Sequence, residues 1–168
     1  MRSNRGSSII CACVLFSLVA VTAVASESLP FDKYPSRIFR GKPAVPQLRT
    51  PLALEHRTAI RNGAKHGPNF AGHYTVVDWG CGTSCGVYVI MDARTGEIHE
   101  PPEISKGVDL GVAGPEFRPN SKLMVVASCP PPEVFGFKNC ERKFYKWDGS
   151  HLVLIKTESM TSALDKPR

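Results

Sequence analysis

The segment from Gly67 to Gly86, GPNFAGHYTVVDWGCGTSCG, constrains the fold of this chain more than any other. It joins a predicted helix to a run of predicted strands, so the chain must turn around it. The segment also contains Cys81, Cys85, a histidine and one of the two tryptophans. These residue types in a glycine-rich loop indicate either a functional site or a structural hinge between the helix and the strands.

Residues 1–25 have the pattern of a secretory signal peptide. Arg2 and Arg5 form a basic start without acids, an apolar run follows over 9–21, and Ala23-Val24-Ala25 is a small-x-small cleavage site. This apolar run is short for a bilayer, which needs about 20 residues. We expect cleavage after Ala25 and a periplasmic or secreted protein with no integral membrane segment after processing.

The charge and length of the mature chain limit its possible partners and its number of domains. Removing Arg2 and Arg5 from the 21 basic residues leaves 19 against 15 acidic ones, a net charge of +4. The basic residues form no long run, so nucleic-acid binding is not indicated. The length predicts a single β-rich domain over 50–158. An extended, proline-containing lead-in over 26–49 precedes this domain, and a flexible tail over 159–168 follows it.

One helix is predicted before the strands, over about 51–63. Thr50 is a good N-cap, and Pro51 is tolerated at the first helical position. Gly63 or Gly67 is expected to end this helix, and Pro68 prevents it from resuming.

Six strands are predicted after the helix from β-branched and aromatic runs separated by turn residues. Asp92 to Gly96 and Asp148-Gly149 are the clearest hairpin turns. The predicted fold is therefore mainly β (α+β), with an N-terminal helix, a six-stranded antiparallel meander that is propeller-blade-like or sandwich-like, and disulfide cross-links. The six predicted strands cover residues 73–79, 87–92, 97–100, 122–128, 140–147 and 151–156.

Four cysteines remain after the signal peptide takes Cys11 and Cys13 with it. An even number in an exported chain favours two disulfides. We prefer the pairs Cys81–Cys85 and Cys129–Cys140, with crossed pairing as the main alternative. Loops of this size contribute roughly 2–3 kcal/mol each when they are closed.

The same loop also suggests two kinds of chemistry. In a cysteine hydrolase, Cys81 or Cys85 would be the nucleophile, His73 the base and Asp78 the orienting group. A metal site would use the same four residues, but their spacing is not typical of structural zinc. Both are less favoured than a disulfide, because the cysteines lie between predicted strands in an exported chain. We predict no metal site and no cofactor.

Two loops are candidates for binding a partner protein. The first spans 80–86 and presents Thr83 and Ser84, with Trp79 beside it either packed under the loop or facing the partner. The second spans 130–137, where prolines stiffen a tip that carries Val134, Phe135 and Phe137. We expect the partner to be another envelope or secreted protein.

The motif FAGHYTVVDWGCGTSC, with DARTG, PNSKLMVV and a Tyr-x-Trp-Asp-Gly ending, resembles a family of small exported proteobacterial proteins. The resemblance covers about residues 50–157. That family has no known activity, so it implies no catalytic residues. The architecture also looks like that of periplasmic immunity proteins, which implies an inhibitor-like or immunity-like role. The sequence therefore favours a binding protein, with a small cell-envelope hydrolase or a structural envelope component as alternatives.

Overall fold

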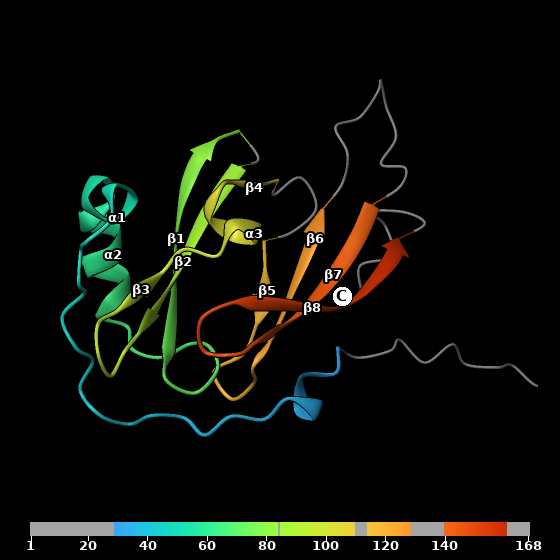
Figure 1. Cartoon of the computed structure of the whole chain (residues 1–168), viewed down its shortest axis with the longest axis horizontal. Helices are drawn as coiled ribbons and strands as arrows, with labels where there is room; N and C mark the ends of the chain where they lie inside the picture. The colour runs from blue at the N-terminus through green and yellow to red at the C-terminus, as the bar shows by residue number, and fades with distance from the viewer. Residues whose placement is uncertain (1–28, 84, 110–113, 129–139, 161–168) are drawn as a thin grey trace, which may run out of the picture.

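Two antiparallel β-sheets make up most of the structure (Figure 1). The computed structural model describes residues 29–83, 85–109, 114–128 and 140–160. In the first sheet, the strand order is β1 (Tyr74–Gly82), β2 (Cys85–Asp92) and β3 (Ile98–His99), and β4 (Val108–Asp109) also pairs with β2. In the second sheet, the order is β5 (Glu116–Phe117), β6 (Leu123–Ser128), β7 (Cys140–Trp147) and β8 (Leu152–Met160).

The fold is mainly β and antiparallel, as predicted, and it is not a closed barrel. Each of the six predicted strands corresponds to one of the longer observed strands or to β3. The predicted blade-like or sandwich-like meander left the number of sheets open, and the structure has two. The two-residue strands β4 and β5 were not predicted. Both short strands lie between the third and fourth predicted strands, within residues 101–121. Ser159 lies in β8 and not in the predicted tail.

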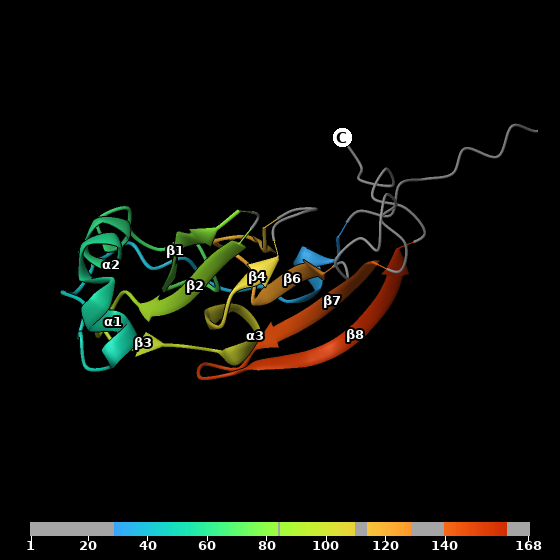
Figure 2. The same ribbon diagram turned by 90° about the horizontal axis from the view of Figure 1, so that it is seen from above.

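The predicted single helix is two helices, α1 (Pro51–Glu55) and α2 (Arg57–Ala64), separated at His56. The hydroxyl of Thr50 caps α1 by accepting a hydrogen bond from the Ala53 amide at 3.1 Å. Both helices cover the side of the first sheet that faces away from the second sheet (Figures 1 and 2). Two short helical turns complete the elements, the 3₁₀ helix η1 (Phe31–Lys33) and α3 (Pro102–Ser105).

Gly63 does not end the helix as one reading of the sequence predicted. It lies inside α2, and a Cβ atom at this position would be 2.7 Å from both γ-carbons of Val77 on β1. The glycine therefore allows α2 to approach the sheet closely. Gly67, with a φ of +75°, lies beyond the helix and turns the chain toward β1.

The main hydrophobic core lies between the two sheets. Strand β6 lies between β5 and β7, and its apolar residues 123–126 are all buried. Trp147 of β7 reaches across to the first sheet, where its ring centroid lies 5.2 Å from that of Tyr74. The largest cluster comprises Phe70, Ala71, Tyr74, Val76, Tyr88, Ile90, Ile104, Val108, Met124, Val126, Tyr145, Trp147 and Leu152.

The lead-in segment, defined here as residues 29–49, is irregular apart from η1, but it is attached to both sheets. The Ser36 amide donates to the carbonyl of Asn120 at 2.8 Å, next to the second sheet. Farther along, the Ala44 amide donates at 2.8 Å to the carbonyl of Ala93, beside the first sheet. The lead-in segment therefore connects the two sheets along one side of the molecule.

No helix within the described ranges is long and apolar enough to cross a membrane.

Candidate functional site

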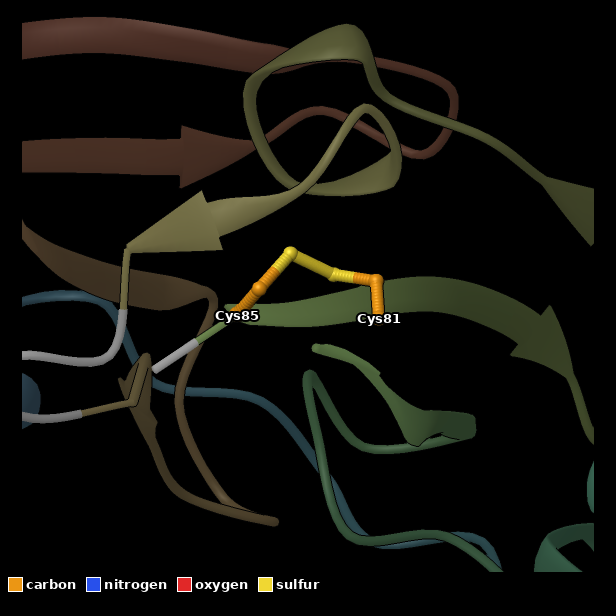
Figure 3. Close-up of a disulfide and its surroundings, with 2 residues drawn as sticks. All are labelled: Cys81 and Cys85. Carbon is orange, nitrogen blue, oxygen red and sulfur yellow. A yellow bond between two sulfur atoms is a disulfide. The ribbon is translucent and has the colours of Figure 1, made fainter. Parts of the chain in front are cut away.

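The hairpin tip, residues 80–86 between β1 and β2, contains a disulfide between Cys81 and Cys85 (Figure 3). The two Cα atoms are 5.1 Å apart, and the bond joins the second-to-last residue of β1 to the first residue of β2. This pairing confirms the first predicted disulfide. Cys81, Gly82 and Thr83 are exposed, whereas Cys85 is half-buried.

Local sequence explains how the tip is built. Gly82 has a φ of +136°, in a region that side chains disfavour, and the strand register shifts between Gly80 and Gly82. On the other side of β2, Cys85 pairs with Asp109 of β4. Gly107 precedes β4, and a Cβ there would lie 3.3 Å from the sulfur of Cys85. The disulfide is therefore flanked closely by β4 as well as by its own hairpin.

The second predicted disulfide is described in part. Cys140, where β7 begins, is buried and disulfide-bonded. Cys129 lies outside the described residues, so the Cys129–Cys140 pairing stays a prediction.

Trp79 is half-buried beside the tip, on the side of the sheet covered by the helices. Its ring stacks on the imidazole of His56, with centroids 4.3 Å apart and planes inclined by 21°. It also packs against the cluster that contains Ile60 and Val89. Thr83 is exposed at the tip. The other predicted contact residues, Ser84, Val134, Phe135 and Phe137, lie outside the described residues.

The structure does not bring the predicted catalytic residues together. His73 precedes β1 and Cys81 lies near its far end, which is roughly 25 Å along an extended strand. Both Cys81 and Cys85 are held in the disulfide, and a disulfide sulfur is not the thiolate that attacks a substrate. Asp78 is exposed and pairs in register with Tyr88, far along β1 from His73.

His73 instead belongs to a different cluster, with Asp92 and Arg94. Its Nε2 atom lies 2.6 Å from Nη2 of Arg94 and 3.7 Å from Oδ2 of Asp92, a buried carboxylate. The Ala93 amide donates to the His73 carbonyl at 2.8 Å and fixes the turn beside the histidine. Asp92 and Arg94 were not predicted as site residues, although antiparallel pairing of the predicted strands 73–79 and 87–92 places the start of the first beside the end of the second.

Burial lowers the pKa of His73 below its usual 6.5. The carboxylate of Asp92 opposes this shift, whereas the positive charges of Arg94 and Lys122 reinforce it. The imidazole is therefore neutral at pH 7. Because a guanidinium can only donate, Nε2 accepts the hydrogen bond from Arg94 and the ring proton lies on Nδ1.

We expect the imidazole resonances of His73 to titrate with a midpoint below 6.5 in an NMR pH series. Asp92→Asn should lower this midpoint further, because the substitution removes the charge that stabilises the imidazolium. The pKa of His73 is higher in the unfolded chain than in the folded one, so the unfolded chain takes up the proton first as the pH falls. His73 should therefore make the fold less stable below about pH 6.5. A midpoint above 6.5, or a rise after Asp92→Asn, would contradict this assignment.

Within residues 29–83, 85–109, 114–128 and 140–160, no group of three or more His, Cys, Asp or Glu side chains is placed to hold a metal ion.

No family model, no curated protein and no solved structure matches this chain. Its function must therefore be inferred from its own residues.

Proposed function

We propose that this protein is an exported binding protein, located in the periplasm or secreted, that contacts another envelope or secreted protein through the hairpin tip. The observation that carries this proposal is the disulfide-closed and exposed tip at the end of β1 and β2. Binding residues are often found on loops that a rigid scaffold positions.

The geometry of the tip supports a preorganised contact surface. The Cys81–Cys85 bond restricts the loop, and Gly107 allows β4 to lie against it. A loop that is already ordered loses less conformational freedom when a partner binds, which favours affinity. Thr83 and the exposed backbone of Gly82 would provide the polar contacts, while the stacking of Trp79 on His56 supports the base of the tip.

The second contact surface in this proposal is the loop 130–137, with Val134, Phe135 and Phe137. The role that we propose is inhibitor-like or immunity-like, as the architectural resemblance to periplasmic immunity proteins implies. A propeller-blade-like arrangement is part of the same proposal, and the up-and-down order β5-β6-β7-β8 supports it. A cysteine hydrolase is less well supported, because His73 is distant from the two cysteines and both are oxidised.

Site-specific crosslinking tests the binding role. A photo-crosslinking residue at Thr83 should give one dominant adduct in cells that export the protein. The same residue at Glu97, which is exposed at the opposite end of the first sheet, should not give this adduct.

The disulfide provides a second comparison. A Cys81→Ser/Cys85→Ser variant should lose about 2 kcal/mol of stability, because a short loop is no longer closed, and should give a weaker adduct from Thr83. Far-UV circular dichroism would verify that the variant remains folded. Equal adducts from Thr83 and Glu97, or turnover of cell-wall amides by the purified protein, would refute the proposal.

A further inference from the structure

A pocket of about 460 Å³ lies at the opposite end of β1 from the hairpin tip. The lead-in segment forms one part of its wall, and the cluster around His73 forms the other. Three of its six lining residues are arginines, and two are apolar. The pocket is lined by Arg37, Ile38, Phe39, Arg40, His73 and Arg94.

The positive charge of this pocket is only partly compensated. Asp92 is engaged with the turn, because it accepts a hydrogen bond from the Arg94 amide at 2.8 Å and lies 3.5 Å from the Arg94 guanidinium. No carboxylate of the described residues lies within salt-bridge distance of Arg37 or Arg40. The six residues that line the pocket therefore include three arginines and a neutral histidine but no carboxylate.

The excess of positive charge in the pocket follows from the local sequence. Residues 36–66 contain seven lysines and arginines and a single acid, Glu55. Glu55 ends α1 and is exposed, and its Oε1 lies 4.0 Å from the neighbouring His56. The two lead-in arginines of the pocket thus have no acidic residue within four positions on either side along the chain.

The backbone beneath the arginines is held firmly. The Phe39 amide donates to the carbonyl of Gly72 at 2.8 Å, and the hydroxyl of Ser36 donates to the carbonyl of Ala71 at 3.0 Å. Gly72 is so close to the lead-in segment that a Cβ there would lie 2.4 Å from the Arg37 carbonyl oxygen. The Cα positions of Arg37 and Arg40 are therefore set by the fold, which reduces the ordering needed to bind a ligand.

We propose that this pocket binds the phosphate group of a small phosphomonoester. Guanidinium groups recognise oxyanions through paired, charge-assisted hydrogen bonds, and Arg37, Arg40 and Arg94 would supply them. A phosphomonoester carries a charge of about −1.5 to −2 at pH 7, which matches the surplus better than a single carboxylate does. Ile38 and Phe39 provide apolar wall for the organic part, and the volume exceeds that needed for phosphate alone.

The first measurement is calorimetric titration of the purified protein with glycerol 3-phosphate at low ionic strength. We expect saturable binding, and no heat with glycerol. Glycerate, which carries a carboxylate in place of the phosphate, should bind more weakly. If neither glycerol 3-phosphate nor phosphatidic acid vesicles bind, or if glycerate binds as tightly, the proposal is wrong.

Two matched double variants separate a site from general attraction of anions. Arg37→Gln/Arg40→Gln should weaken binding about tenfold or more, because charged hydrogen bonds are lost. Arg49→Gln/Arg57→Gln removes the same charge from exposed positions outside the pocket and should leave the affinity within about twofold. Near-UV circular dichroism would verify that both variants are folded. Equal losses in the two variants would overturn the proposal.

The source of the phosphate is resolved by a vesicle measurement. Phosphatidic acid vesicles should retain more protein than phosphatidylcholine vesicles only if a lipid headgroup fits the pocket. The Arg37→Gln/Arg40→Gln variant should then lose this retention. Binding of glycerol 3-phosphate without vesicle retention would assign a soluble ligand instead. Neither outcome depends on the hairpin tip, so this proposal and the binding role can fail separately.

Discussion

Replacing Trp147 with alanine is expected to lower the free energy of unfolding by about 3–5 kcal/mol. The Trp147 side chain is 1% exposed and extends from β7 of the second sheet toward the first. Its ring centroid lies 5.2 Å from that of Tyr74, 5.4 Å from that of His99 and 6.2 Å from that of Phe70. The substitution would leave a cavity where the two sheets meet, and the cavity could close only if one sheet moved against the other.

Urea unfolding followed by far-UV circular dichroism would measure this loss. Trp147→Phe keeps an aromatic ring and should cost less than the alanine variant. Val153→Ala, on the neighbouring strand β8, removes a side chain from a residue that is 48% exposed and should change stability by less than about 0.5 kcal/mol. If Trp147→Ala costs no more than Val153→Ala, Trp147 does not join the sheets as described.

Gly96→Ala is expected to cost about 2–4 kcal/mol, from backbone strain together with a steric clash. Gly96 has a φ of +80°, and a Cβ there would lie 2.0 Å from the carbonyl oxygen of Val45. The carbonyl of Gly96 also accepts a hydrogen bond from the Gln47 amide at 2.7 Å. Alanine would therefore push the lead-in segment away from the turn that follows β2.

Gly149→Ala is the matched control for this substitution. Gly149 also has a positive φ, +116°, but the nearest atom to its Cβ would be the Tyr74 hydroxyl oxygen at 3.7 Å, an ordinary contact. The difference between the two variants in urea unfolding isolates the clash with the lead-in segment. Equal losses would mean that only backbone strain matters at Gly96.

The sequence predicted the individual strands well, because local patterns determine them. The Asp148-Gly149 turn forms as predicted, with the Asp148 carboxylate accepting hydrogen bonds from the amides of Ser150 and His151, both at 2.8 Å. The Cys81–Cys85 disulfide followed from spacing and an even number of cysteines. Which strands belong to which of the two sheets was not predictable in this way, since that division depends on side chains such as Trp147 that pack against residues far away in the sequence.

The candidate site also depends on contacts that local sequence patterns do not predict. His73 was grouped with the cysteines because they are near in sequence, but eight residues of extended strand place them at opposite ends of β1. The predicted strand over 73–79 already implied this separation, because an extended strand holds its first and last residues far apart. The phosphate pocket needs the lead-in segment to lie beside Gly72 and Arg94, and no local pattern in residues 37–40 indicates that position.

The lead-in segment also has a consequence for the order in which the chain folds. The buried hydroxyl of Ser121 donates to the carbonyl of Phe31 at 2.7 Å, across 90 positions of sequence, and the Lys122 amide donates to the carbonyl of Tyr34 at 2.7 Å. During synthesis, residues 31–34 therefore emerge long before their partners exist. Contacts of such long range slow folding. Residues 31–34 thus reach their final place only after the chain has been made as far as Lys122, at the start of the second sheet's longer strands.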